Sequence, residues 1–263
     1  MTIRYSDGLR NFLQAGGSYK AAFANSIIEF YSGTQPASAN TAPPGTLLAT
    51  ISVASGAVTS EVLATGGTTL VGVAGSVDTF TVNSLEIMGS ATAFNTSLTQ
   101  TAADVVTKIN NNPKNWLYVA SSVAAAITIT AKPGLGTLPN TWVVTPLGSG
   151  GITFTGTANM SGGVNAVNGL KFNGSTTGAL VKDPAQTWSG VGTAAAATGT
   201  AAGWFRQKGS VVDAGATDAN AVFLRLDGSI ATSGADMTVS NVTIVKDATF
   251  TLNKFTPQEP GTA

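Results

Sequence analysis

Residues 27–53 read IIEFYSGTQPASANTAPPGTLLATISV, and the change from strand-type to turn-type segments within this stretch is repeated along the chain. Two runs rich in β-branched, aromatic and leucine residues, Ile27–Tyr31 and Leu47–Val53, flank a segment with Gly33-Thr34-Gln35-Pro36 and Pro43-Pro44-Gly45. β-Branched and aromatic side chains favour strands, whereas Gly and Pro favour turns. The stretch therefore predicts two strands joined by a long surface loop.

Further strand candidates occur along the rest of the chain, each bounded by Gly, Pro, Asn or Ser. They are Asp78–Asn83, Leu85–Met88, Trp116–Ala120, Ala126–Ala131, Thr141–Thr145, Ile152–Thr155, Leu170–Phe172, Ala179–Val181, Gly203–Arg206, Ala221–Leu226, Val239–Val245 and Thr249–Phe255. So many short runs with frequent turn residues are typical of a mainly β protein.

The first thirty residues form a different pattern, which predicts two short amphipathic helices. Asp7 is a candidate cap for the first helix, Gly16-Gly17 ends it, and Ser18 begins the second. One interpretation is that the helices cap one end of the β core, and the other is that they dock onto a partner subunit. The candidate docking residues are Leu9, Phe12, Leu13, Tyr19 and Phe23.

An interior helix is predicted where apolar residues recur at positions i, i+3, i+4 and i+7. These residues are Ala102, Val105, Val106 and Ile109. Thr101 and Asp104 imitate a capping box, and Asn110–Pro113 stops the helix. With the neighbouring strand candidates, the helix predicts a small α+β module over residues 66–163, entered through Thr65-Gly66-Gly67 and left through Ser161-Gly162-Gly163.

The predicted fold is a split β-sandwich or jelly-roll-like domain with this α+β module inserted and a short helical N-terminus. The expected parts are a helical segment over residues 1–30, a discontinuous sandwich over 31–65 and 164–256, the module over 66–163 and a polar tail over 257–263. Gly-rich junctions are sites where domain insertions are tolerated. Residues 194–202, rich in Ala, Thr and Gly, are expected to form a loop or a slender strand pair.

The composition favours a structural role over catalysis. The 263 residues include 13 basic and 13 acidic side chains but no histidine and no cysteine. Imidazole and thiolate groups carry much of the acid–base, nucleophilic and metal chemistry of enzymes near neutral pH. Charged residues make up 10% of the chain, against roughly 25% in a typical soluble domain, and mean hydropathy is +0.22. We therefore expect a folded, non-enzymatic chain that forms homo-oligomers and does not bind nucleic acid.

The residues that remain for chemistry form no recognisable constellation. Asp213, Asp218, Asp227 and Asp236 stand beside Gly, Ala or Asn, which predicts turns rather than a pair of glycosidase carboxylates. No calcium-loop spacing occurs, and the glycines of Gly134-Leu135-Gly136 and of residues 148–151 fit hairpin turns better than phosphate loops. The sequence accordingly predicts no catalytic residue, no metal and no cofactor.

The four tryptophans leave an alternative open. Trp116, Trp142, Trp188 and Trp204 are large rings in a β protein, where they either fill the core or present stacking platforms to a sugar. The second interpretation predicts a carbohydrate-binding surface module.

No apolar run approaches the ~20 residues of a membrane-spanning helix, and residues 1–10 show no secretion signal. We therefore expect no membrane partner and synthesis in a cytoplasm.

Several stretches together carry a resemblance to known proteins. They are Gly8–Leu13, Ile28–Pro36, Pro44–Ala49, Trp188-Ser189-Gly190, Gly203-Trp204-Phe205 and Leu226–Asp236. This set resembles a group of poorly characterised virion-associated proteins of tailed bacteriophages and prophages. The Phe80-Thr81-Val82-Asn83 and Ile127–Ala131 stretches, with the helix between them, are similar to small modules of phage tail and baseplate proteins.

The resemblance implies a structural component of a tailed-phage virion, made in the bacterial host cytoplasm. The expected role is a head-associated decoration or cement protein, or a neck or fibre-anchoring protein, with major capsid, neck or tail subunits as partners. A tail-tube, baseplate or fibre-base subunit is the alternative. The resemblance transfers no catalytic residue to this chain.

Overall fold

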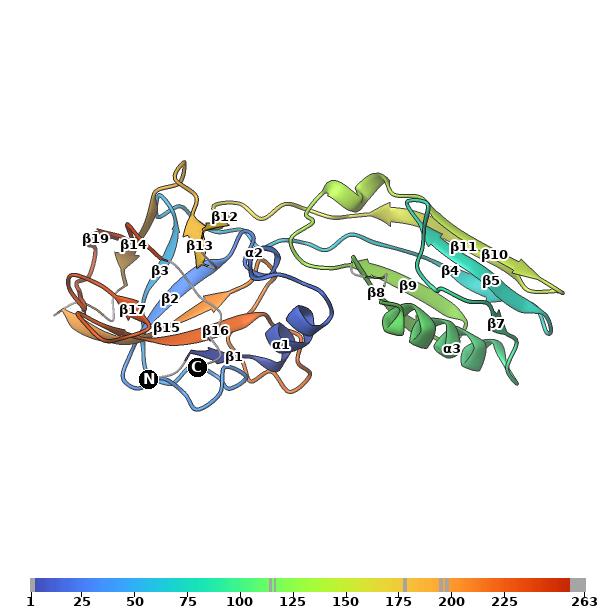
Figure 1. Cartoon of the computed structure of the whole chain (residues 1–263), viewed down its shortest axis with the longest axis horizontal. Helices are drawn as coiled ribbons and strands as arrows, with labels where there is room; N and C mark the ends of the chain where they lie inside the picture. Colours follow the sequence, from blue (N-terminus) through green and yellow to red (C-terminus); the bar gives the residue numbers. More distant parts are fainter. Residues whose placement is uncertain are drawn as a thin grey trace. The chain divides into compact units, whose positions relative to one another are not determined.

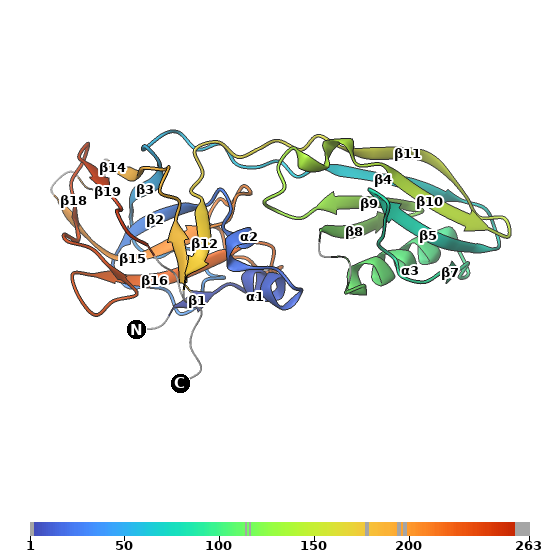
Figure 2. The same ribbon diagram turned by 45° about the horizontal axis from the view of Figure 1, so that its top comes forward.

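The computed structural model describes residues 3–113, 115, 117–176, 179–193, 196 and 199–255, and it shows a mainly β protein built from antiparallel sheets. The chain divides into two compact units (Figures 1 and 2). Unit 1 combines Met1–Ser60 with Ala166–Ala263, and unit 2 comprises Glu61–Asn165. The sandwich-like β class is confirmed, whereas a jelly-roll strand order stays a prediction.

Unit 1 is built on a large, mainly antiparallel sheet, and its elements come from both ends of the chain. They are β1 (Arg4–Tyr5), α1 (Asp7–Gln14), α2 (Tyr19–Ala22), β2 (Ile27–Ser32), β3 (Leu47–Val53), β12 (Phe172–Thr176), β13 (Ala179–Lys182), β14 (Trp188–Gly192), β15 (Thr200–Lys208), β16 (Arg225–Ala231), β17 (Met237–Thr238), β18 (Thr243–Ile244) and β19 (Thr249–Thr251). The order across the sheet is β1-β16-β15-β2-β3-β14-β19, with β17 beside β16 and β18 beside β15. The N-terminal strands β2 and β3 therefore lie between C-terminal strands, which makes unit 1 discontinuous in sequence.

The two faces of this sheet differ because successive side chains on a strand point to opposite sides. One face carries Ile28 and Phe30 of β2, Phe205 of β15 and Trp188 of β14, all of them buried. The β12–β13 hairpin packs on this apolar face (Figure 2), where Phe172 contacts Trp188 edge to face. The opposite face carries charged side chains, described below.

The helix α1 begins at a serine cap. Asp7 was the predicted cap, but it lies in the first turn, and Ser6 caps the helix instead. The Ser6 hydroxyl accepts hydrogen bonds from the backbone N–H groups of Leu9 and Arg225 and donates one to the carbonyl of Phe223. One buried hydroxyl thus joins the N-terminal helix to the strand β16. Ser18 caps α2, as predicted.

We predict that Ser6→Ala lowers the free energy of unfolding of unit 1 by about 2 kcal/mol, because it removes the cap and leaves buried backbone groups without a partner. Ser18→Ala, which removes an exposed cap from a one-turn helix, is the matched control and should cost about 0.5 kcal/mol. Urea denaturation followed by circular dichroism measures both, and equal losses would contradict the role of Ser6.

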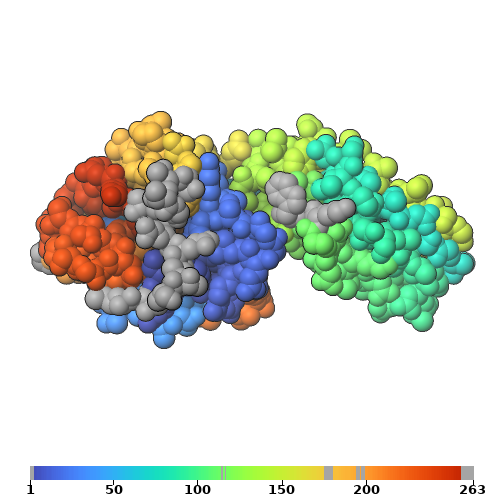
Figure 3. Space-filling model, viewed as in Figure 1, coloured from blue at the N-terminus to red at the C-terminus, as the bar shows by residue number. Residues whose placement is uncertain are grey.

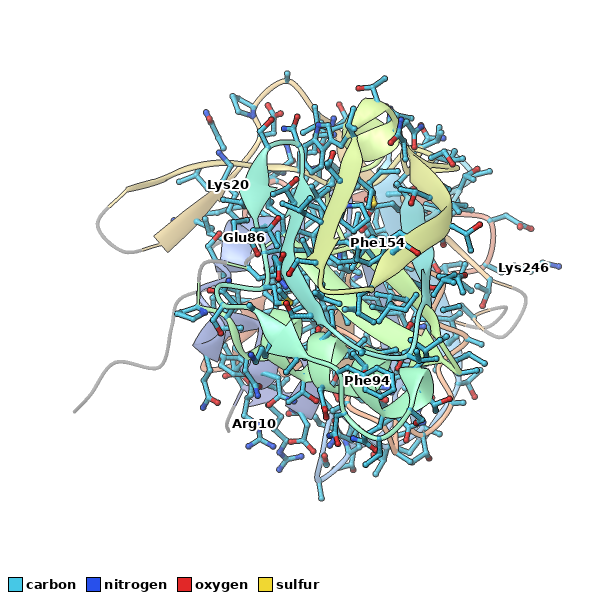
Figure 4. The ribbon with its side chains drawn as sticks, turned by 90° about the vertical axis from the view of Figure 1, so that its right-hand side faces the viewer. Arg10, Lys20, Glu86, Phe94, Phe154 and Lys246 are labelled. Carbon is cyan, nitrogen blue, oxygen red and sulfur yellow. The ribbon has the colours of Figure 1, made fainter. Side chains whose placement is uncertain are left out.

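Unit 2 is an α+β unit. Its elements are β4 (Thr65–Val71), β5 (Ser76–Val82), β6 (Leu85–Glu86), β7 (Thr92–Ala93), α3 (Leu98–Asn111), β8 (Tyr118–Val123), β9 (Ala126–Ala131), the 3₁₀ helix η1 (Leu138–Thr141), β10 (Val144–Ser149) and β11 (Thr153–Ser161). One sheet has the order β11-β4-β9-β8, and the other has β10-β5-β6 with β7 also beside β5. The helix α3 packs on β8 and β9 (Figure 1). Phe94 and Phe154 pack against the same core (Figure 4).

The interior helix is confirmed, and its start differs from the predicted one. Ser97 caps α3 through the backbone N–H of Gln100, so Thr101 lies within the helix and does not cap it. The predicted apolar stripe is largely confirmed, since Ala102, Val105 and Ile109 are buried.

Several strand boundaries differ from the sequence predictions. Gly66-Gly67, predicted as a junction, lies inside β4, and the change between units falls after Ser60 and after Asn165. The strand predicted over Ala221–Leu226 begins only at Arg225, and β14 was not predicted. Trp116, the tail over residues 257–263 and much of the stretch over residues 194–202 lie outside the described residues.

Candidate functional site

The predicted docking residues belong mainly to the core of unit 1. Leu9, Tyr19 and Phe23 are buried, and Tyr19 contacts Tyr5 edge to face. Phe12 and Leu13 are only partly buried and pack against the same core. Leu9, Tyr19 and Phe23 are therefore unavailable to a partner in the folded chain, because the N-terminal helices use them to cover the β core.

The tryptophan side chains that the structure describes do not form exposed platforms. Trp188 and Trp204 have no exposed surface, and the Trp188 indole N–H donates to Gln186. Trp204 stacks on Tyr31 with ring centroids 4.5 Å apart. Trp142 is half-buried and lies edge-on to Tyr118, and Trp116 is outside the described residues. Core filling accounts for Trp188 and Trp204, so neither ring offers a face to a sugar.

The most highly charged site of unit 1 is an ionic cluster on the polar face of the large sheet. It consists of Glu29, Arg206, Lys208, Asp213, Arg225 and Asp227. β-Sheet register brings the cluster together, because Arg206 lies opposite Glu29 on β2 and opposite Asp227 on β16. Asp213 comes from the loop between β15 and β16. These residues carry three positive and three negative charges, so the cluster is neutral.

The central pair is Arg206 with Asp227. The guanidinium donates through Nε and Nη2 to the two carboxylate oxygens, each at 2.7 Å, and both side chains are fully buried. Burial alone would lower the pKa of Arg206, but the hydrogen bonds and charge of Asp227 raise it above its usual value. Asp227 was predicted to lie in a turn. That prediction was wrong, because Asp227 lies within β16 and its partner is distant in sequence.

A second pair joins Arg225 to Asp213. Arg225 donates to the two oxygens of Asp213 at 2.6 and 2.7 Å. Lys208 lies opposite Arg225 in the sheet, and like charges placed directly opposite each other are destabilising. Asp213 offsets this repulsion, since its carboxylate binds Arg225 and its backbone carbonyl accepts from Lys208 at 3.2 Å.

Glu29 completes the cluster. Its carboxylate contacts the Lys208 ammonium at 2.8 and 2.9 Å and accepts a hydrogen bond of 2.7 Å from the Tyr31 hydroxyl. Burial and the Glu29 charge raise the pKa of Tyr31 above its usual value, so the phenol stays protonated. Every carboxylate of the cluster is therefore paired inside the protein.

The cluster anchors two loops over the sheet. Arg206 donates to the carbonyl of Thr41 at 3.0 Å, and Arg225 donates to that of Ala216 at 2.8 Å. Thr41 lies in the loop between β2 and β3, and Ala216 lies in the loop between β15 and β16. The geometry is that of a clamp for loops, with buried charges that hold backbone carbonyls.

Asp218 and Asp236, two other aspartates of the sequence analysis, do lie in loops. Asp218 accepts from the backbone N–H groups of Val222 and Phe223. Asp236 accepts from the backbone and the hydroxyl of Ser229. Both carboxylates organise turns, in agreement with the sequence prediction.

Unit 2 carries an uncharged sheet surface, which we call the outer face. It is the side of the β11-β4-β9-β8 sheet away from α3, and none of the four strands contains a charged residue. Its residues are Thr65, Gly67, Thr69 and Val71 on β4, Ala126, Thr128 and Thr130 on β9, Val119, Ser121 and Val123 on β8, and Thr153, Thr155, Ala158 and Ser161 on β11. Val123 is 81% exposed and Val119 is 48% exposed. Threonine hydroxyls and valine methyl groups thus share a broad surface without charge.

Residues 3–255, apart from the gaps given above, contain no group of three or more acidic side chains placed to hold a metal ion. In the same residues, no helix is both long enough and apolar enough to cross a membrane.

Comparison of the chain with models of protein families, with curated proteins and with solved structures found no match. The geometry of this chain therefore has to support its own functional proposal.

We predict that Arg206→Met lowers the free energy of unfolding by about 3–5 kcal/mol, because Asp227 is left as a buried charge without its partner. Adding Asp227→Leu should recover part of this loss, since no uncompensated charge then remains. Arg10→Ala, which removes an exposed ion pair with Asp7, is the control and should leave the unfolding midpoint unchanged. Denaturant titration measures the free energy of unfolding of all three variants. A double variant that is less stable than Arg206→Met would contradict the assignment of the loss to the unpaired Asp227.

A pH dependence follows from Asp213. Burial would raise the pKa of this carboxyl, but the hydrogen bonds from Arg225 and Gly215 and the charge of Lys208 lower it below the usual value. A depressed folded-state pKa stabilises the fold above the unfolded value of about 3.9, and this stability is lost as pH falls through the folded-state pKa. Asp213→Asn should therefore be less stable than the wild type at neutral pH, and this difference in stability should become smaller below about pH 4. Thermal unfolding between pH 7 and pH 2 measures the difference between the two proteins. A difference that does not change with pH would contradict the lowered pKa of Asp213.

Proposed function

We propose that this chain is a non-enzymatic structural component of a tailed-phage virion, placed on the head as a decoration or cement protein or at the neck as a fibre-anchoring protein. It acts through repeated protein–protein contacts. The observation that carries the proposal is the outer face of unit 2, a wide exposed sheet surface without a single charged residue.

An uncharged face of this kind suits contacts within an assembly. Charged residues are depleted at the centres of protein interfaces, because each charge must lose its water on association. The outer face carries hydroxyl and methyl groups that lose little on desolvation when they meet a similar surface. Because the outer face carries no charge, it is not repelled electrostatically by the same face of an identical copy.

The size of the outer face indicates weak individual contacts. Four strands spaced ~4.8 Å apart and about six residues long at ~3.3 Å per residue cover roughly 400 Å². A stable pairwise interface buries about 800 Å² on each partner. One such contact is therefore insufficient alone, whereas many repeated contacts on a symmetric particle raise the overall avidity strongly.

The buried ionic cluster of unit 1 supports the same proposal. Six of the 26 charged side chains are withdrawn into the ionic cluster, so the surface is even poorer in charge than the composition indicates. Some of the stretches that resemble virion-associated proteins lie in unit 1, such as Ile28–Pro36, with most of β2, and Leu226–Asp236, with most of β16. The stretches of unit 2 that are similar to tail and baseplate modules include Ile127–Ala131, which lies in β9 and carries Thr128 and Thr130 of the outer face.

The proposal is tested on particles of the phage or prophage that encodes the chain. We expect the protein in purified particles and antibody label on the head or neck in electron micrographs. Label along the tail would move the assignment to a tail-tube, baseplate or fibre-base subunit. Absence of the protein from purified infectious particles would overturn the proposal.

We further predict that Val123→Glu and Thr128→Glu, which place charges on the outer face, reduce incorporation into particles by about tenfold or more without unfolding the protein. Val73→Glu is the matched control, because Val73 is 85% exposed and lies in the loop between β4 and β5. Quantitative immunoblots of purified particles give the incorporation, and circular dichroism checks the fold. Equal incorporation of all three variants would show that the outer face makes no contact in the particle.

A further inference from the structure

An open strand edge borders a cavity in the C-terminal part of unit 1, the red segment of Figure 3. The cavity has a volume of about 500 Å³ and is lined by residues of the segment 238–254 together with Phe30. The strand β19 forms one wall and is the last strand of the large sheet. Among the described residues, no other strand pairs with the outer edge of β19.

The hydrogen-bond pattern of β19 shows which of its backbone groups are unused. The N–H of Leu252 donates to the carbonyl of Trp188, and the N–H of Gly192 donates to the carbonyl of Ala248. In an antiparallel pair, hydrogen-bonded and non-hydrogen-bonded positions alternate. Phe250, opposite Gly190, is therefore a hydrogen-bonded position, and the backbone groups of Thr249 and Thr251 point away from β14. No hydrogen bond within the described residues occupies those groups.

The floor of the cavity is apolar. Phe250 stacks on Phe30 with ring centroids 5.5 Å apart, and the Phe250 ring lies against Gly190, where a larger residue would collide with it. Ile244 and Leu252 add aliphatic surface. The remaining lining is mostly hydroxyl and amide groups, and Lys254 is the one charged residue among the lining residues.

Three other edge strands, β1, β8 and β10, are protected in different ways. The strand β1, at the opposite edge of the large sheet, is two residues long and carries Arg4, which donates to the carbonyl of Pro36. In unit 2, the edge of β8 is occupied by the Asn110 side chain, which bonds both the N–H and the carbonyl of Ala120. The edge strand β10 contains Pro146. Short strands, charges, side-chain caps and proline are the usual protections of sheet edges, and β19 has none of them apart from its short length.

We propose that the edge of β19 is a strand-addition site that binds an extended, uncharged polypeptide segment of a neighbouring chain. The segment pairs through its backbone with Thr249 and Thr251 and places the side chains of every second position on the face of the sheet that carries Phe250 and Leu252. Backbone pairing supplies the affinity, and the alternating pocket supplies the specificity. This inference deepens the proposed function, since in a particle the segment would belong to a neighbouring subunit.

The test uses the whole chain and a synthetic probe, the peptide acetyl-Thr-Val-Thr-Val-Thr-Val-amide with a fluorescent label, in an anisotropy titration. We expect saturable binding to the wild type. Thr251→Pro removes an edge N–H that makes no bond in the free protein, so the fold should survive while affinity falls about tenfold. Thr251→Val keeps the N–H and the β-branched shape of an exposed side chain, and should bind within about twofold of the wild type.

Two further probes keep the test decisive if Thr251→Pro fails to fold. The peptide is methylated on alternate backbone nitrogens in either of two sets. Strand pairing predicts that one set abolishes binding and the other does not, because only every second N–H faces the edge. Equal binding of both methylated peptides, or no binding of the parent peptide to the wild type, overturns the strand-addition site. Neither result decides the proposed function, because the particle experiment measures incorporation of the protein and not its affinity for a peptide.

Discussion

The fully buried pair of Arg206 and Asp227 is the interaction on which unit 1 depends. A guanidinium and a carboxylate removed from water lose several kcal/mol of hydration each, and only bidentate geometry with further hydrogen bonds offsets that cost. The pair obtains both, through two contacts of 2.7 Å and the donation to the carbonyl of Thr41. Such a pair adds little net stability, but it disfavours other strand registers. A slip of one residue between β15 and β16 would turn one of the two charges to the apolar face and leave the other buried without its partner.

This constraint links the two ends of the chain. Glu29 comes from the N-terminal segment, and Arg206 and Asp227 come from the C-terminal segment, on neighbouring strands of one sheet. The correct register of β2, β15 and β16 therefore has to form across the whole of unit 2 in sequence. Ser6 adds a second link of the same kind, since its hydroxyl bonds the backbone of Leu9 and of Arg225. Specific polar bonds thus join segments that are distant in sequence, and they help to offset the entropy lost when the long connection between those segments is closed.

The local pattern of the sequence was sufficient for the elements with strong periodicity. The strands Leu47–Val53 and Ala126–Ala131 have their predicted bounds, and the interior helix lies at its predicted place. Ala126–Ala131 and the helix bury residues at regular intervals, so their own periodicity identifies them. Leu47–Val53 is buried on both faces, and its composition between turn residues identifies it. The strand β14, with the sequence WSGVG, was missed because its glycines serve packing, which no local propensity records.

The candidate sites were less predictable for a related reason. Asp227 is followed by glycine and was interpreted as a turn residue, since the partner that makes it a buried strand residue lies 21 positions away. The docking residues Leu9, Tyr19 and Phe23 were correctly recognised as apolar helix faces, but a single sequence does not say whether such a face meets its own core or a partner. The open edge of β19 had no signal in the sequence either, because an unused hydrogen bond is a property of the sheet order.

Part of the charge in this protein is placed differently from the usual pattern. Most soluble proteins keep paired charges at the surface and protect sheet edges with lysine. Here six charged side chains lie inside unit 1, while the outer face of unit 2 and the edge of β19 present threonine and valine or phenylalanine to the surroundings. Buried charges fix the register of the sheet from within, so the surface does not need charge to specify the fold. A chain that specifies its fold in this way is free to use neutral surfaces for contact with other chains.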